Sequence, residues 1–412
     1  MKVLQVNCVF RHGSTGKIVD DIHKVLQRRG IDSVVCYGRR NNVKPERKIY
    51  KFCKESESYW HHVLALFGIS QAYGGNHIPT RRLIKIVEKE KPDIVHLHCI
   101  NGYCVNIFNL LRYLGQHKIR TVVTNHAEFF YTGNCGHAYD CNKWRHIPGC
   151  GKCPMLKFAT GSIWLDRTRS SWQNMKDAFS SHKKENLLFT AVSPWVRSRL
   201  EQSPITKGFD CEVVENGVDT NIFKLTQLSQ FLRERIGEYR TEPLVFHVTA
   251  AFSSNPWHIK GGYYVIEVAK RMPDVKFIVA AIDGEVANLP SNVLFWGRTH
   301  SQQELAELYS CADVTLLTSK RETYSMVTAE SLCCGTPVVG FKAGGPETIA
   351  LPEYSRFVEY GNVDELVKAL REMLKQEKDK EAISQKGQCR YSKERMTDSY
   401  LKIYHTLLFR QE

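Results

Sequence analysis

Two successive series of alternating apolar strands and amphipathic helices run through the 412 residues. The first series opens on "MKVLQVNCVF", a near-continuous apolar stretch of the kind that a parallel sheet buries on both faces. "IVHLHC" and "RTVVTNH" continue it, with helical periodicities between the strands. The second series begins at "PLVFHVTAAF" and goes on through "VTLLTS". The alternation predicts an α/β fold with two Rossmann-like domains in tandem.

The two series set the expected domain organisation. We expect a first domain over residues 1–225, with a cysteine-rich insert at about 130–160. A second domain is expected over residues 226–392. The closing stretch, 393–412, is amphipathic and predicts a helix that packs back on the first domain.

Charge is distributed unevenly along the chain. Residues 1–200 carry a net charge of +18, whereas the remainder carries −4. A basic half suits an anionic partner, and phospholipid, a phosphorylated acceptor and nucleic acid are the alternatives to a basic surface that is merely solvated. The sequence has no recognition helix, stacking-aromatic motif or basic arm, so nucleic acid is not expected. Peripheral contact with an anionic membrane is favoured by cations on one helix and its end, namely Arg81, Arg82, Lys85, Lys89 and Lys91.

The hydropathy of the chain and its first residues indicate in which cell compartment to expect the protein. The sequence has no run of 18 apolar residues, and it starts on a strand rather than a signal peptide. A cytoplasmic protein is therefore expected, placed at the inner face of the membrane if it binds lipid. Most of its 14 cysteines would then be free thiols.

The turn after the first strand reads "RHGSTGKI", which raises the question of a phosphate-binding loop. A Walker A loop needs four residues between its glycines and a Ser or Thr after the lysine. Here only Ser14 and Thr15 separate Gly13 from Gly16, and Ile18 follows the lysine. The stretch is therefore either a small-residue turn that lets a ligand approach backbone N–H groups or a tight turn with no ligand. A helix is predicted from Ile18 onward.

The strongest chemical signal is "SKRETYSMVTAESLCCGTPVV", residues 319–339. Glu322 leaves a strand end, a short turn follows, and a helix then carries Glu330. Ligands of open α/β sheets sit at the carboxyl ends of strands, and the N–H groups at this helix start would face an anion. Carboxylates on either side suit hydroxyl-rich groups, although two surface glutamates would give the same pattern.

This stretch resembles the EX₇E signature of the retaining glycosyltransferases of family 4, which have the GT-B fold. The resemblance extends over nearly the whole chain. "VVENGVDTNIF" is similar to the family's interdomain stretch, and "GFKAGGPETI" is similar to its Gly-Gly loop. It implies two Rossmann-like domains facing across a cleft. It also implies a transferase for cell-surface polysaccharide of the bacterial exopolysaccharide or colanic-acid type. The donor would be a UDP- or GDP-sugar, and the acceptor a glycan or a polyprenyl-diphosphate-linked sugar.

The resemblance also implies roles for individual residues. His126 would stand beside the reacting carbon, and Glu322 would support positive charge on the donor sugar. Other positions would bind the donor, namely Gly13, Ser14, Thr15, Gly16, Lys260, Arg298, Ser325, Met326, Val327 and Glu330. Lys260 and the helix N–H groups would neutralise the leaving diphosphate, so no metal or other cofactor is expected for catalysis.

One position departs from the family pattern. An arginine usually precedes the lysine by several residues, but "TAAFSSNPWHIK" has none. An inactive scaffold of the same fold therefore stays an alternative, and a zinc-containing nucleic-acid-binding protein is a more distant one.

The insert contains four cysteines spaced C-x₅-C-x₈-C-x₂-C, namely Cys135, Cys141, Cys150 and Cys153. A C-x₂-C pair in a glycine-rich turn is typical of tetrahedral zinc. Free thiols and a disulfide are the alternatives. Such a zinc ion would be structural, because four sulfur ligands leave no open coordination position. The insert is similar to a cysteine-bearing insert of glycosyltransferases of the colanic acid type.

Overall fold

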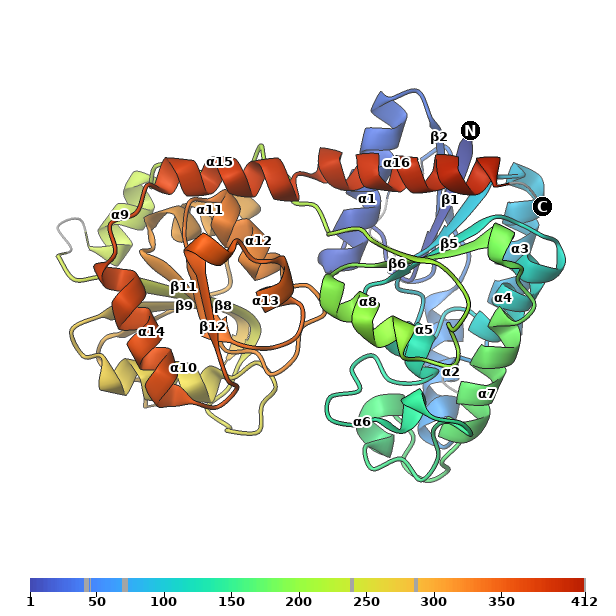
Figure 1. The fold of residues 1–412 in the computed structure, drawn as a ribbon, viewed down its shortest axis with the longest axis horizontal. Coiled ribbons are helices and arrows are strands. Elements are labelled where there is room, and N and C mark those ends of the chain that lie inside the picture. Colours follow the sequence, from blue (N-terminus) through green and yellow to red (C-terminus); the bar gives the residue numbers. More distant parts are fainter. Residues whose placement is uncertain (41–43, 45, 69–72, 238–240, 285–287, 411–412) are drawn as a thin grey trace. The chain divides into compact units, whose positions relative to one another are not determined.

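A computed structural model describes the chain except for residues 41–43, 45, 69–72, 238–240, 285–287 and 411–412 (Figure 1). The chain divides into two units. The first consists of Met1–Glu215 together with Met396–Glu412, and the second of Asn216–Arg395. The predicted divisions lay at residues 225 and 392, within about ten residues of these.

The first unit is built on a parallel sheet of seven strands in the order β3-β2-β1-β4-β5-β6-β7. Its strands are β1 (Lys2–Asn7), β2 (Asp32–Tyr37), β3 (Ile49–Lys51), β4 (Ile94–Leu97), β5 (Thr121–Asn125), β6 (Leu187–Ala191) and β7 (Cys211–Val213). The central strands are buried almost throughout, as their continuous apolar sequences predict. The order turns back between β1 and β4, the kind of switch point at which ligands bind in such sheets.

Helices connect these strands and complete the unit. They are α1 (Gly13–Arg28), α2 (Glu55–Leu66), α3 (His77–Glu90), α4 (Ile107–Gln116), α5 (Phe129–Thr132), α6 (Leu156–Thr160), α7 (Thr168–Phe179) and α8 (Pro194–Glu201), with the last turns of α16 (Lys393–Phe409). Tyr400 and Tyr404 of α16 are fully buried, and the Tyr404 hydroxyl lies 2.7 Å from Nδ1 of His96 in β4. The terminal helix therefore forms part of the core of the first unit.

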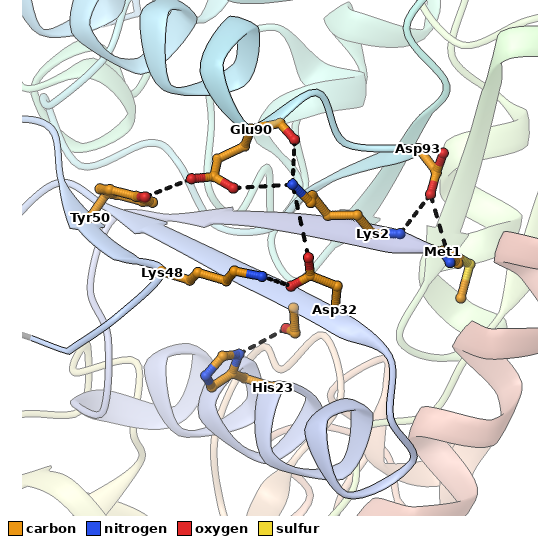
Figure 2. A network of polar contacts seen from close by, with 9 residues as sticks. Met1, Lys2, His23, Asp32, Lys48, Tyr50, Glu90 and Asp93 are labelled. Atoms are coloured by element: carbon orange, nitrogen blue, oxygen red, sulfur yellow. Dashed lines mark hydrogen bonds and ion pairs between the residues drawn. The ribbon is translucent and has the colours of Figure 1, made fainter.

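A network of charged and polar side chains joins the amino-terminal ends of this sheet (Figure 2). Lys2 Nζ lies 3.3 Å from a Glu90 carboxylate oxygen and 3.8 Å from one of Asp32. Tyr50 donates a 2.6 Å hydrogen bond to Glu90, and Lys48 pairs with Asp32. These contacts fasten β1, β2, β3 and α3 to one another. They lie at the opposite edge from the carboxyl ends of the strands, where ligands of such sheets bind.

The second unit has a parallel sheet of six strands in the order β10-β9-β8-β11-β12-β13. Its strands are β8 (Leu244–Phe252), β9 (Lys276–Gly284), β10 (Val293–Gly297), β11 (Val314–Leu317), β12 (Val338–Phe341) and β13 (Ser355–Val358). Its helices are α9 (Gln230–Ile236), α10 (Gly262–Arg271), α11 (Gln302–Cys311), α12 (Met326–Cys333), α13 (Pro346–Ile349), α14 (Val363–Lys375) and α15 (Lys380–Tyr391). Both units are thus Rossmann-like, as the alternation predicts.

Candidate active site

The loops that follow three neighbouring strands of the second unit lie at the same edge of its sheet. β8, β11 and β12 are adjacent and parallel, so the loops after them lie side by side. The loop after β8 touches the loop after β11, because Lys320 N donates to the Ile259 carbonyl at 2.8 Å. Gly261 permits this approach: its φ is +69°, and a Cβ there would collide with the Thr318 carbonyl. The contact brings Lys260 beside the start of the EX₇E stretch.

Lys260 and Glu322 form an ion pair in this region. Lys260 Nζ lies 2.7 Å from Glu322 Oε1, and the two side chains are 31% and 23% exposed. The sequence assigned one to the leaving diphosphate and the other to the donor sugar, but it gave no indication that they meet. A cation and a carboxylate held together and still open to solvent can contact an anionic group and a hydroxylated ring at the same time.

The Gly-Gly loop after β12 fixes the backbone of Glu322. Glu322 N donates to the Ala343 carbonyl at 3.0 Å, and Gly345 N donates to the Glu322 carbonyl at 2.8 Å. Glu347 in turn accepts from Gly344 N at 2.9 Å and from Ala343 N at 3.0 Å. This loop acts on Glu322 through main-chain hydrogen bonds, so the Glu322 side chain stays free to pair with Lys260.

Helix α12 begins directly after this turn. Ser325 is its N-cap with φ +85°, and its hydroxyl accepts from Thr328 N at 3.2 Å. The N–H groups of Met326 and Val327 lie in the first turn, where a helix has no internal acceptor for them. One turn later the Tyr309 hydroxyl of α11 donates to Glu330 Oε2 at 3.1 Å. Tyr309 is buried, so it orients Glu330; the sequence reasoning did not find this residue.

Arg298 stands apart from this group. It is exposed and follows β10, the edge strand, which β9 and β8 separate from β11. The sequence reasoning also missed Trp257, whose side chain is 90% exposed in the loop between β8 and Lys260. A large apolar side chain in a loop at the carboxyl edge of a sheet is a candidate for ligand contact.

In the first unit the small-residue stretch is helical, which corrects the sequence prediction. α1 begins at Gly13 rather than at Ile18, so Gly13, Ser14, Thr15 and Gly16 form its first turn. The turn packs tightly on the preceding loop, since a Cβ on Gly16 would lie 3.2 Å from a methyl group of Val9. The lack of a side chain at position 16 therefore lets the helix start early.

His126 directly follows β5 and is the first of three histidines that contact one another in series. Its Nε2 lies 3.1 Å from Nδ1 of His98, which follows the adjacent strand β4. The rings of His98 and His96 are 3.8 Å apart, and His96 is bonded to Tyr404 of α16. Burial lowers the pKa of His126 to about 4 and also depresses the pKa of the other two histidines. His126 is therefore neutral near pH 7 and can accept or donate a hydrogen bond.

A buried ion pair supports the loop after His126. Glu128 is fully buried and pairs with Arg199 of α8. Glu128 also accepts from the Tyr131 hydroxyl at 2.8 Å and from Ala138 N. Both carboxylate oxygens are thus occupied, and they fix the start of the cysteine-rich insert relative to β5.

The four cysteines of the insert are near neighbours with free thiols. Burial raises the pKa of Cys135, and repulsion from Cys150, Cys153 and Cys141 raises it further. As they stand, no three of these side chains are arranged to hold a metal ion, and neither is any other group of His, Cys, Asp and Glu in the described ranges. Zinc binding would require the thiols to draw together, and it stays a prediction.

Two Rossmann-like units, each with candidate ligand-binding residues at the carboxyl edge of its parallel sheet, have the architecture of the GT-B fold. The chain belongs to glycosyltransferase family 4, whose family model matches residues 15–222. A second model, glycosyl transferases group 1, matches residues 260–390.

Known proteins resemble the whole chain. WcaC of Escherichia coli (strain K12), a glycosyl transferase assigned provisionally to colanic acid biosynthesis, is 20% identical over 99% of this chain and 100% of its own length. Anabaena Alr3699/HepE, solved in complex with UDP-glucose, has a TM-score of 0.65 and 15% identity over 98% of this chain and 100% of its own. WaaG, a glycosyltransferase involved in lipopolysaccharide biosynthesis, has a TM-score of 0.61 and 14% identity over 98% and 99% of the two chains.

Proposed function

We propose that this family 4 enzyme transfers a sugar from a nucleoside diphosphate sugar to a glycan or a polyprenyl-diphosphate-linked acceptor. The reaction would retain the anomeric configuration and would serve cell-surface polysaccharide synthesis. The observation that carries the proposal is the Lys260–Glu322 pair at the start of α12. The WcaC resemblance and the UDP-glucose complex of Alr3699/HepE support the substrate class.

The residues of the second unit match the charge changes of that reaction. The bond between the anomeric carbon and the diphosphate oxygen breaks, and the electron pair remains on the diphosphate. The Lys260 ammonium and the N–H groups of Met326 and Val327 would stabilise this charge. Glu322 would face the positive charge on the sugar ring, and Glu330, held by Tyr309, would accept hydrogen bonds from the ribose hydroxyls.

The acceptor hydroxyl forms the new bond to the anomeric carbon, and its proton passes to the departing diphosphate oxygen, which holds the electron pair of the broken bond. Because His126 is neutral near pH 7, it would contribute a hydrogen bond rather than a charge on this side. No divalent cation is needed in this scheme, since Lys260 and the helix start serve the diphosphate. Arg298 would lie near the nucleotide base, and the first turn of α1 would lie near the donor phosphates or the acceptor.

The proposal is tested first by donor binding. A panel of UDP- and GDP-sugars is screened by thermal shift, because a ligand that binds only the folded state raises the melting temperature. One donor is expected to stabilise the wild type, whereas Glu330→Ala should lose most of that shift. Glu347 stays intact in this variant, so the loop that fixes Glu322 is unchanged.

Turnover is the second test. Glu322→Gln should keep donor binding but lose most transfer, because an amide cannot support positive charge at the reacting carbon. Release of the nucleoside diphosphate at the wild-type rate in this variant would exclude Glu322 from the reaction. Failure of every nucleotide sugar to bind would favour the inactive scaffold.

A further inference from the structure

Large apolar side chains are exposed in one region of the first unit. They belong to α2 and the residue after it, and to α6 with the loop that follows. We call this set the apolar platform, and it consists of Tyr59, Trp60, Leu64, Phe67, Phe158, Ile163, Trp164 and Leu165. Each of these side chains is at least 40% exposed, and Trp164 reaches 77%. Most of the exposed large apolar side chains in the described ranges lie here, which marks an interaction surface rather than scattered exposure.

The platform is continuous although its two segments are far apart in sequence. Ile163 N donates to the Leu66 carbonyl at 2.8 Å, which joins the loop after α6 to the end of α2. Gly68 packs directly on Leu165, where a Cβ would collide with the leucine side chain. α2 and α6 also contact each other, and both lie at the end of the unit away from α16 (Figure 1).

The stretch that carries α6 is strongly basic, whereas α2 carries Glu55 and Glu57 in its first turn. Residues 143–169 contain a single carboxylate, Asp166, against six cations, namely Lys143, Arg145, Lys152, Lys157, Arg167 and Arg169. The Asp166 carboxylate accepts from Cys153 N at 2.6 Å and from Thr168 N at 2.8 Å, so it is held by the backbone. Lys157 and Arg167, on either side of the exposed stretch 163–165, are themselves exposed.

A cavity of about 820 Å³ opens at the edge of the platform. Trp60, Leu64 and Ile78 form apolar parts of its wall, and Arg167 contributes a guanidinium. An apolar wall with a cation beside it fits a lipid that has an anionic headgroup and a hydrocarbon chain.

The basic helix α3 is a weaker candidate for the same role. Arg82 is held by both carboxylate oxygens of Glu57, at 2.8 and 2.6 Å, and Lys89 lies over the ring of Tyr50. The helix also carries Glu88 and Glu90. Part of its positive charge is therefore already compensated within the protein.

We propose that the apolar platform docks this enzyme on an anionic lipid bilayer. Trp164, Phe67 and their neighbours enter the interfacial layer, where amphipathic and aromatic side chains are favoured. Lys157 and Arg167 meet the lipid phosphates at the same depth. Charge complementarity favours lipid over a protein partner, because the exposed cations Lys157 and Arg167 flank an apolar surface that includes two tryptophans. Of the helices in the described ranges, none has the length and apolar character that a bilayer crossing requires, so the docking is peripheral.

This inference deepens the proposed function, since a polyprenyl-linked acceptor would be offered at the same bilayer. The two can fail separately. Vesicle binding is measured without any sugar, and donor binding is measured without vesicles.

The experiment is co-sedimentation of the full chain with phosphatidylcholine vesicles, with and without phosphatidylglycerol. The wild type should bind only the anionic vesicles. Trp164→Gln combined with Phe67→Ser should weaken binding by about tenfold or more, because interfacial affinity scales with buried apolar area. Lys157→Gln combined with Arg167→Gln should remove the preference for phosphatidylglycerol. The matched control is Phe231→Ser with Phe409→Ser, since these side chains are 63% and 79% exposed outside the platform, and it should bind as the wild type does.

Three outcomes would overturn the proposal. Wild type that binds neither vesicle type at low salt excludes a lipid surface. If the platform variants bind as the wild type does, and Arg81→Gln with Lys85→Gln loses binding, then α3 and not the platform is the lipid contact. A dimer seen by analytical ultracentrifugation that dissociates in the platform variant would make this surface an interface between two copies. Unchanged melting temperatures and retained donor binding in all variants ensure that loss of binding is not loss of folding.

Discussion

Replacement of Lys260 by methionine separates the two effects that its ion pair with Glu322 can have. Methionine keeps the length of the side chain but removes the ammonium that lies 2.7 Å from Glu322 Oε1. The variant therefore loses a contact in the free enzyme and, on our proposal, a second contact to the leaving diphosphate. These two losses differ greatly in size.

The stability effect should be small. The two side chains are 31% and 23% exposed, and solvent-exposed ion pairs contribute about 0–1 kcal/mol to folding. The effect on turnover should be much larger, because a fixed group that stabilises charge in the transition state contributes about 2.7–4 kcal/mol, or 10²- to 10³-fold in rate. The structure thus predicts a variant that is nearly as stable as the wild type but almost inactive.

The assay combines urea unfolding with release of nucleoside diphosphate from the donor that the thermal-shift screen identifies. Lys270→Met is the matched control, because Lys270 pairs with Glu267 at 2.8 Å on the same unit but outside the site. The control should show a similarly small change in stability and no change in turnover.

Turnover in Lys260→Met within about threefold of the wild type would refute the assignment of this lysine to the diphosphate. A loss of several kcal/mol of stability would refute the magnitude argument instead. Lys260→Arg then decides between the two, because it keeps the charge and should recover part of the rate if charge is what matters.

Three further outcomes are expected. Gly345→Ala would place a methyl group against the Thr323 backbone, so it should displace Glu322 and lower transfer at least about tenfold; an unaltered rate would show that the loop can yield. Because the pKa of His126 falls from about 6.5 in the unfolded chain to about 4 in the folded one, the stability that it contributes is complete above pH 6.5 and is lost as the pH falls toward 4. The free energy of unfolding, measured with urea, should thus fall by about 2–3 kcal/mol less between pH 7 and 4.5 in His126→Gln than in the wild type. Transfer should persist in EDTA, because no divalent cation serves the diphosphate. Elemental analysis should find one zinc per chain, and Cys150→Ser should remove it; a wild type without zinc would show that the four cysteines are ordinary thiols.

Much of the fold could be predicted because buried parallel strands have continuous apolar sequences that stand out along the chain. β4, β8 and β11 lie within one or two residues of their predicted bounds. The edge strands β3, β7 and β13 were not predicted. Three or four residues are too few to show the alternation of a strand, and these strands are only partly buried, so they lack a continuous apolar run. Propensity also misplaced the start of α1, where two glycines argue against a helix and tertiary packing decides otherwise.

The candidate site was only partly accessible from sequence. The EX₇E spacing identifies Glu322 and Glu330 because both lie on one short stretch. The contact between His98 and His126 could not be found in this way, because it depends on the register of two adjacent strands. The apolar platform was missed for a similar reason. Its residues read as ordinary core positions until the structure shows that nothing in the described chain covers them.

The membership of α16 in the first unit has a consequence for biosynthesis. Tyr400 and Tyr404 bond to residues of β4 and β5, yet they are translated only after every strand of the second sheet. The strands of the second unit can pair as soon as they emerge, whereas the first must wait with part of its core unfilled. During synthesis the amino-terminal half is therefore the more exposed to proteases and chaperones. A chain released after residue 395 should hold a finished second unit attached to an incomplete first one.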